Sequence, residues 1–265
     1  MVQRAVAIRP PFAGINSRDR RPLVSRELRL GVLERLKANG DVVIPLEKKS
    51  LDEGIAAIQK SGATSVAVCF LHSYLNPVHE LAAVQRLVEA LPGVSISRSS
   101  DVLPQIKEYE RVSTTIVNAY VEPVVRRYLT NLAQRLVEAG FKGSLFIVLS
   151  HGGMAPLEEA SRLAAGTVLS GPAGGVSGGR RCAELLEIAD LVPFDMGGTS
   201  TDISLISAGQ ASLSADGMLA GQRIALRSLD IASIAAGGGS IASVDASGTL
   251  HVGPESAGSV PGPAC

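Results

Sequence analysis

The stretch DMGGTSTDISLI, residues 195–206, holds two glycines and three hydroxyl side chains between the aspartates Asp195 and Asp202. Apolar residues lie on both sides, in LVPF (191–194) and ISLI (203–206). This pattern predicts a strand, a glycine-rich turn and a second strand. Two interpretations of the turn are open: an ordinary hairpin turn capped by Asp and Thr, or a loop that holds a phosphate group.

The composition of the turn suits an anion. Gly197 and Gly198 can adopt positive φ and present bare backbone N–H groups, and consecutive N–H groups that point one way form an anion nest. The neighbouring residues Thr199, Ser200 and Thr201 add hydroxyl donors. For the whole stretch after a predicted strand, we favour the phosphate interpretation over the plain hairpin.

The two aspartates point to a metal ion as well. Asp195 and Asp202 would repel a bound phosphate unless a divalent cation lay between them. Mg²⁺ prefers a few carboxylates together with phosphate oxygens and water. We therefore predict that Asp195 and Asp202 are the catalytic carboxylates and that Asp195 binds Mg²⁺.

Two further glycine-rich segments have similar ingredients. In SGPAGGV (170–176), Ser170 and Gly171 precede a predicted helix, whose N-terminus attracts anions. AAGGGSIA (235–242) contains Gly237, Gly238 and Gly239 and is either a close-approach turn against a nucleotide or a flexible turn. Each segment is weak evidence alone, but glycine turns at several strand ends favour a ligand, because ligands in α/β folds bind at strand ends.

The first part of the chain has an α/β pattern. A hairpin is predicted over 30–46, around Asn39-Gly40. A helix is predicted over 50–62, with a capping box of Ser50 and Glu53 and a stop at Gly62. The segments TSVAVCFL, NPVHELAAVQRLVEALPG and VSISRS follow as strand, helix and strand, which predicts a parallel α/β layer.

A long amphipathic helix over 115–140 follows, with Pro123 as a point of interruption and Gly140 as its stop. The pattern changes there from the α/β layer to a helix and then to glycine-punctuated strands. We therefore predict two α/β units, 1–115 and 116–265.

Composition excludes several classes of protein. Lys and Arg together equal Asp and Glu, at 25 each, and RDRR (18–21) is the densest basic cluster, so no nucleic-acid surface is predicted. The apolar runs are too short to span a bilayer, and the N-terminus lacks a signal-peptide core. No metal spacing or disulfide framework is visible among the residues His72, His79, His151, His251, Cys69, Cys182 and Cys265. We expect a cytoplasmic protein that binds neither membrane nor nucleic acid.

Six segments together give a specific family resemblance: VAVCFLHSYLNPVHE (66–80), EYERVSTTIVNAYVEP (108–123), LSGPAGGV (169–176), DMGGTSTDISLI (195–206), AAGGGSIASVD (235–245) and VGPESAGSVPGPAC (252–265). The chain resembles the hydantoinase A / 5-oxoprolinase family, which includes N-methylhydantoinase subunits and acetone or acetophenone carboxylase subunits. Residues 1–115 are similar to the C-terminal part of the family's N-terminal domain. Residues 116–265 are similar to the N-terminal part of the hydantoinase A domain.

The resemblance implies an actin/Hsp70/sugar-kinase-like (ribonuclease H-like) ATPase fold that uses ATP and Mg²⁺. It implies that Asp195 holds Mg²⁺ or its water, that Gly197, Gly198 and Thr199 surround phosphate, and that Thr201 and Asp202 support them. The implied reaction is ATP-dependent opening of a cyclic amide, of the hydantoin or 5-oxoproline class, through a phosphorylated intermediate. ATP-dependent carboxylation of the acetone or acetophenone type is the alternative.

The sequence also departs from the family pattern. No GGTFTD-type first phosphate loop precedes DMGGTSTD, and the family continues past PGPAC (261–265). We therefore expect an internal piece of a longer protein or a truncated gene product, with an incomplete fold and a hydantoinase B-type partner subunit or domain beside the small-molecule substrate. A non-catalytic nucleotide-binding or subunit-interaction module is the third alternative.

Overall fold

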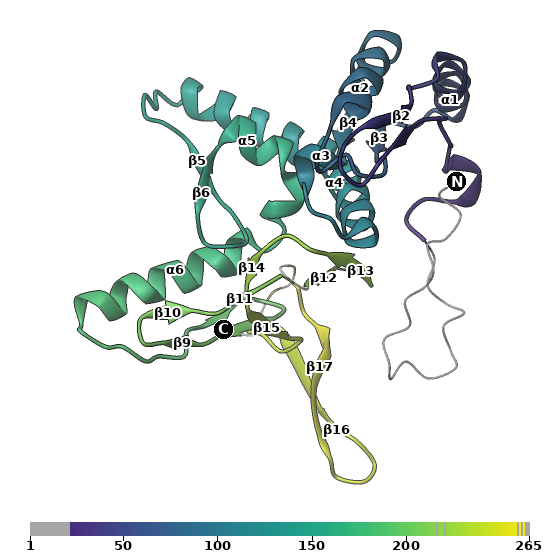
Figure 1. Cartoon of the computed structure of the whole chain (residues 1–265). Coiled ribbons are helices and arrows are strands. Elements are labelled where there is room, and N and C mark those ends of the chain that lie inside the picture. Colours follow the sequence, from purple (N-terminus) through teal and green to yellow (C-terminus); the bar gives the residue numbers. More distant parts are fainter. Residues whose placement is uncertain (1–21, 216, 220, 259, 261, 263–265) are drawn as a thin grey trace. The chain divides into compact units, whose positions relative to one another are not determined.

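The computed structural model describes residues 22–215, 217–219, 221–258, 260 and 262, so the RDRR cluster and Cys265 lie outside the described residues. The chain divides into two compact units (Figure 1). Unit 1 comprises residues 1–145, 157–165 and 216–226, and unit 2 comprises 146–156, 166–215 and 227–265. In the part of the chain that is described, no helix is both long and apolar enough to cross a membrane.

Unit 1 contains the predicted parallel layer. The strands β3 (Ser65–Val68) and β4 (Ser95–Arg98) pair in parallel, and α2 (Val78–Ala90) connects them. The helix α1 (Lys48–Ser61) packs with α2 over β3 (Figure 1). The buried residues of this core are Leu51, Ile55, Val68, Ala83, Leu87 and Leu91. The prediction of strand, helix and parallel strand is confirmed.

The hairpin before this layer is also confirmed, but the capping box is wrong. The strands β1 (Arg35–Leu36) and β2 (Val42–Ile44) pair antiparallel. The helix α1 begins at Lys48, so Ser50 lies inside its first turn rather than before it. The Ser50 hydroxyl donates to the Glu47 carbonyl and accepts from the Leu33 N–H, a partner distant in sequence. Gly62 ends α1 in the left-handed conformation, as predicted.

A single long helix, α4 (Glu108–Glu138), dominates the rest of unit 1. It contains Pro123 without ending there. The Asn118 side chain links α4 to α5 (Leu157–Arg162) and the residues after it. Its amide group donates to the Arg162 carbonyl, and its oxygen accepts from the Ala165 N–H. The remaining elements of unit 1 are η2 (Arg26–Leu28), α3 (Ser99–Val102), β12 (Gly217–Leu219) and β13 (Gln222–Ile224).

A buried carboxylate joins the segments that follow β3 and β4. Glu80 of α2 is fully buried, and it accepts hydrogen bonds from the N–H groups of Phe70 and Ser100 and from the Ser99 hydroxyl, at 2.9, 2.8 and 2.5 Å. A buried ionised group must be hydrogen-bonded to be tolerated, and these three donors meet that need.

A buried guanidinium completes the same network. Arg111, near the start of α4, is 1% exposed. It donates to the Phe70 carbonyl at 2.8 Å, to the Ser99 hydroxyl at 3.2 Å and to the Ser73 hydroxyl. Ser99 therefore bridges Arg111 and Glu80, and the positive charge lies near the negative one. This network ties α4 to the carboxyl ends of both parallel strands.

Unit 2 is built around a three-stranded antiparallel sheet in the order β15-β8-β7, with α6 (Ser170–Leu185) packed nearby. Its apolar core contains Ala173 and Val176 of α6 together with Ile206 and Leu229. The strands of unit 2 are β5 (Phe146–Val148), β6 (Met154–Pro156), β7 (Phe194–Met196), β8 (Thr201–Ser204), β9 (Ile206–Ser207), β10 (Gln210–Ala211), β11 (Leu213–Ser214), β14 (Ser228–Leu229), β15 (Ile231–Ile234), β16 (Ser240–Val244) and β17 (Leu250–Ser256). The short helix η3 (Ala164–Thr167) lies where the chain passes from unit 1 to unit 2.

We predict that Glu80→Gln lowers the free energy of unfolding by about 2–4 kcal/mol, because one carboxylate oxygen becomes a donor that faces other donors and Arg111 loses its counter-charge. Urea denaturation measures this change. The control is Glu89→Gln on the exposed side of the same helix, which we expect to change stability by less than about 0.5 kcal/mol. Equal effects of the two substitutions would contradict the role given to Glu80.

The buried network also predicts the reactivity of a thiol. Cys69 is half-buried, and desolvation of its thiol, with the neighbouring Glu80 charge, raises its pKa to about 12, whereas Cys182 is exposed. Because the thiolate is the reactive form, Cys69 stays protonated and unreactive at about pH 8. We expect iodoacetamide to alkylate Cys182 of the native protein and to leave Cys69 unmodified until urea is added, as peptide mass mapping would show. Rapid labelling of native Cys69 would show that the thiol is accessible.

Candidate functional site

The strand, turn and strand predicted at DMGGTSTDISLI are present. The strands β7 and β8 pair antiparallel, with Asp195 opposite Asp202. The turn between them, residues 197–200, is closed by the Gly197 N–H, which donates to the Ser200 carbonyl at 2.9 Å. Directly opposed residues place their side chains on one face of a sheet. The hairpin therefore brings the two predicted carboxylates side by side.

No positive side chain neutralises these carboxylates among the described residues. Asp202 accepts a hydrogen bond from the Ser233 hydroxyl of β15, and Asp195 is exposed. Like charges directly opposite each other destabilise a sheet. The pair is thus an arrangement that a cation would stabilise.

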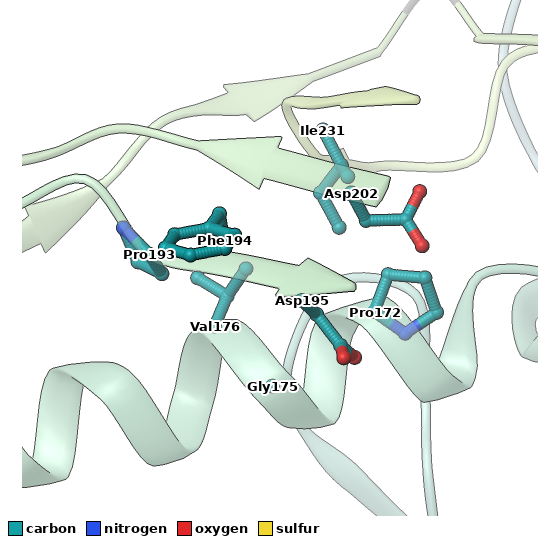
Figure 2. Close-up of a pocket in the computed structure, with 8 residues that line it drawn as sticks. All are labelled: Pro172, Gly175, Val176, Pro193, Phe194, Asp195, Asp202 and Ile231. Atoms are coloured by element: carbon teal, nitrogen blue, oxygen red, sulfur yellow. The ribbon is translucent and has the colours of Figure 1, made fainter. Parts of the chain in front are cut away.

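Both carboxylates line a cavity of about 290 Å³. Figure 2 shows them directed toward Pro172 at the start of α6, while apolar side chains form the opposite part of the wall. The lining residues are Pro172, Gly175, Val176, Pro193, Phe194, Asp195, Asp202 and Ile231.

The start of α6 forms one side of this cavity. The N–H groups of Ser170 and Gly171 have no hydrogen-bond partner among the described residues, as is usual in the first turn of a helix. The Ser170 hydroxyl donates to the Val148 carbonyl at 2.6 Å, so its hydrogen is already engaged. Pro172, Gly175 and Val176 of α6 line the cavity, and these N–H groups of Ser170 and Gly171 directly precede them at the positive end of the helix dipole.

The SGPAGGV segment is not the turn that the sequence predicted. It forms the first two turns of α6 itself. A Cβ atom on Gly175 would lie 3.3 Å from Asp195 Oδ2, and a Cβ atom on Gly179 would lie 3.4 Å from the Pro193 side chain. Glycines four residues apart share one face of a helix, so this face lets α6 approach β7 closely. The spacing of Gly175 and Gly179 is the signal that sequence reasoning missed, together with the apolar lining residues Phe194 and Ile231.

The third glycine segment packs on the turn of the hairpin. The N–H groups of Gly238 and Gly239 donate to the carbonyls of Gly197 and Gly198 at 2.9 and 2.6 Å. The hydroxyl of Thr201, a residue that is 3% exposed, donates to the Ala236 carbonyl at 2.6 Å.

The positive φ considered for Gly197 and Gly198 is absent, because neither residue has a left-handed backbone. Close approach requires glycine at Gly237 and Gly239 of the facing segment, whereas a Cβ atom on Gly197 would meet only Ser200 O, at an ordinary 3.7 Å, and one on Gly198 would meet nothing within 4 Å.

The structure thus gathers most predicted site residues in one unit. Asp195, Asp202 and the residues of the 197–200 turn surround one end of the hairpin, and Gly237–Gly239 lie behind the turn. The Thr199 side chain is exposed and the Ser200 side chain is half-buried. No group of three or more His, Cys, Asp or Glu side chains that could hold a metal ion exists within the described ranges. Two carboxylates match the usual protein contribution to a Mg²⁺ site.

Two family models match the chain. The hydantoinase/oxoprolinase model matches residues 111–265, and the model of the hydantoinase/oxoprolinase N-terminal region matches residues 3–91. The chain belongs to the hydantoinase/oxoprolinase family. The family resemblance predicted from the six segments is therefore confirmed.

Curated relatives have several names. Caprolactamase subunit alpha of Pseudomonas jessenii is 37% identical over 92% of this chain and 35% of its own length. The acetophenone carboxylase gamma subunit of Aromatoleum aromaticum is 32% identical over 92% of the chain and 34% of its own length. The 5-oxoprolinase of Saccharomyces cerevisiae is 37% identical over 86% of the chain and 18% of its own length.

Two solved structures share the fold. The nucleotide-free structure of acetone carboxylase, from work on ATP-dependent acetone carboxylation, superposes with a TM-score of 0.77 at 31% identity, over 90% of this chain and 34% of that one. The ATP-dependent caprolactamase from Pseudomonas jessenii superposes with a TM-score of 0.76 at 34% identity, over 96% and 37%. The chain spans between 17% and 40% of the lengths of the curated relatives that it matches.

We predict that Asp195→Asn raises the free energy of unfolding by about 0.2–1 kcal/mol in buffer that contains a chelator, because it removes the repulsion from Asp202. Added Mg²⁺ reduces the difference in free energy of unfolding between wild type and variant, since a cation beside the two carboxylates of the wild type relieves the same repulsion. Urea denaturation with and without Mg²⁺ tests both statements, with exposed Asp230→Asn as the control. If Asp195→Asn lowered the free energy of unfolding instead, the charge of Asp195 would be stabilising, and the predicted repulsion would be contradicted.

Proposed function

We propose that the chain is the ATP-binding part of an enzyme that opens a cyclic amide of the hydantoin or 5-oxoproline class. The observation that carries this proposal is the cavity where Asp195 and Asp202 face the start of α6, beside the glycine turn. Family membership supports it, as do the names of the caprolactamase and 5-oxoprolinase relatives.

The terminal phosphates of ATP would lie at the turn. The backbone of Gly198 and Thr199 supplies N–H donors that have no partner among the described residues, whereas the Gly197 N–H is bonded to the Ser200 carbonyl within the turn. The hydroxyl groups of Thr199 and Ser200 are within the same turn. Ser170 and Gly171 add the N–H groups that begin α6. Donors from two elements would hold the phosphates, and positioning is the main contribution of a protein to phosphoryl transfer.

The residues present fit Mg²⁺. Asp195 is the proposed ligand, directly or through water, and Asp202 supports it from the facing strand. When bound, the ion neutralises the negative charge of the transferring phosphoryl group. Asp195 and Asp202 would hold the ion from their fixed places on β7 and β8, and the apolar side chains of Phe194 and Ile231 line the same cavity.

The proposed chemistry follows from the inertness of amides. The amide oxygen of the substrate attacks the terminal phosphorus of ATP, and the bond to the ADP oxygen breaks. Water then adds to the activated carbon, and the C–N bond breaks to give an amine and an acyl phosphate. A second water molecule hydrolyses the acyl phosphate to a carboxylate and inorganic phosphate. Two molecules of water and one of ATP are consumed for each ring opened.

We further propose an actin/Hsp70/sugar-kinase-like fold. The family-level division near residue 115 is retained as a proposal, supported by the N-terminal-region model ending at residue 91 and the second model starting at 111. A partner subunit, of the hydantoinase B type, is proposed because relatives carry the names alpha and gamma subunit. A cytoplasmic location, where ATP is available, belongs to the same proposal.

ATP-dependent carboxylation of a ketone is the second candidate, favoured by the TM-score of 0.77 with acetone carboxylase. Ring opening is our first candidate, and the 37% identity with caprolactamase subunit alpha and with 5-oxoprolinase supports it. A nucleotide-binding or subunit-interaction module without turnover is the third candidate, since the first phosphate loop is missing from the sequence.

The test measures phosphate release from ATP by the full chain, alone and co-expressed with the product of the neighbouring gene. Substrates are 5-oxoproline, hydantoin and caprolactam, and then acetone with bicarbonate. We expect ring opening coupled to ATP hydrolysis, and Asp195→Asn to lower kcat by about 100-fold or more while Asp230→Asn does not. Coupling only to bicarbonate and ketone would favour the carboxylase. Tight calorimetric binding of a non-hydrolysable ATP analogue without any turnover would favour the module.

A further inference from the structure

Two carbonyl groups of the hairpin turn accept hydrogen bonds from a segment outside the hairpin. The Gly197 carbonyl accepts from the Gly238 N–H at 2.9 Å, and the Gly198 carbonyl accepts from the Gly239 N–H at 2.6 Å. In an ordinary hairpin turn the first of these carbonyls bonds within the turn, to the N–H three residues on. Here an outside segment takes that bond, so the orientation of both peptide groups depends on residues 237–239.

The held carbonyls fix the direction of two N–H groups. In a planar trans peptide the C=O and the following N–H point in opposite directions. The N–H of Gly198 therefore points away from Gly238, and the N–H of Thr199 points away from Gly239. Neither N–H has a hydrogen-bond partner in the part of the chain that the structure describes. These are the donors that an anion would use.

Steric contacts explain why glycine is needed at alternate positions of the segment. A Cβ atom on Gly237 would lie 2.7 Å from both Gly197 O and Ser200 N and 2.8 Å from Thr199 N, inside the turn. A Cβ atom on Gly239 would lie 2.9 Å from Gly198 O. A Cβ atom on Gly238 would meet only Gly197 O, at an ordinary 3.7 Å. Two of the three glycines are thus required by the turn and the middle one is not.

The segment is itself held in shape by side chains. The Ser240 hydroxyl accepts from the Gly237 N–H at 2.8 Å, and the Ser240 N–H donates to the Gly237 carbonyl at 3.0 Å. The buried Thr201 hydroxyl donates to the Ala236 carbonyl at 2.6 Å. Thr201 therefore directs its hydroxyl to residue 236 of the glycine segment. A hydroxyl that binds a ligand would have to face the cavity instead.

We propose that residues 236–240, with Thr201, are the positioning element of the hairpin turn: they set the direction of its N–H groups and make no contact with the ligand. This differs from the role of ligand-contacting glycines that the sequence predicts for Gly237, Gly238 and Gly239. Only the identification of the ligand as a phosphate rests on the proposed function. The dependence of the turn on residues 236–240 and Thr201 does not.

Hydrogen–deuterium exchange of the ligand-free full chain tests this dependence of the turn. We expect Gly237→Ala to raise by about tenfold or more the exchange rate of the hydrogen-bonded Gly197 amide, followed in a peptide that covers residues 197–201. The matched control is Gly238→Ala, one residue along, which we expect to change that rate by less than about twofold. Equal rates in the two variants, whether both raised or both unchanged, would overturn the proposal.

A second pair of variants keeps the test decisive if Gly237→Ala does not fold. Thr201→Val keeps the shape of the side chain and removes the hydrogen bond to Ala236, whereas Thr201→Ser keeps the bond. We expect faster exchange over residues 197–201 in Thr201→Val and near wild-type exchange in Thr201→Ser. Equal exchange in both variants would show that the bond to Ala236 does not hold the turn.

Calorimetry with a non-hydrolysable ATP analogue separates this inference from the proposed function. If the wild type binds no analogue, the proposed function fails while the exchange results still decide the inference. If the wild type binds, we expect affinity to fall in Gly237→Ala and Thr201→Val in step with their faster exchange. Loss of affinity in Gly238→Ala with unchanged exchange would show direct ligand contact and would overturn the inference.

Discussion

The contact between two stretches of glycine backbone is the constraint on which the site depends. Peptide groups can approach this closely only where no Cβ intervenes, and a Cβ atom on Gly237 would lie 2.7 Å from Gly197 O. The strand β15 pairs with β8 and leads directly into residues 235–239, so the sheet itself delivers this segment to the turn. Sheet pairing, the turn and the direction of its N–H groups are therefore one coupled arrangement.

The same logic applies on the other side of the hairpin, where α6 meets Asp195. Each interior glycine costs a helix about 1 kcal/mol relative to alanine, and α6 contains several. Gly175 and Gly179 offset that cost by letting the helix lie against β7. The close approach brings the positive end of the helix dipole toward the two carboxylates that repel each other across the strands, which lowers the electrostatic cost of placing them together.

Sequence patterns predicted the elements that are set by residues close together in the chain. Alternation and turn residues identified the β3–α2–β4 layer, the Asn39-Gly40 hairpin and the β7–β8 hairpin, because each is set by neighbouring residues. The failures depend on distant partners. Ser50 bonds to Leu33 rather than capping α1, and Gly197 and Gly198 face Gly238 and Gly239 instead of adopting positive φ. The hydrophobic periodicity of a short segment contains no information about such distant contacts. The four-residue spacing of Gly175 and Gly179, by contrast, indicates a helix face that allows close approach.

Family resemblance alone does not separate ligand-binding residues from those that the fold requires, but burial does. The segments 66–80 and 108–123 meet in the network of Glu80 and Arg111, where both residues are at most 1% exposed and their hydrogen bonds are with the protein. Arg111 Nε is the atom of this pair that is buried without a hydrogen-bond partner among the described residues. A buried charge left without its partners is costly, so the fold alone accounts for these residues. The DMGGTSTD stretch differs, because its two carboxylates line a cavity and the N–H groups of Gly198 and Thr199 have no partner among the described residues. The chemistry of the chain is therefore sought where the fold leaves polar groups unsatisfied.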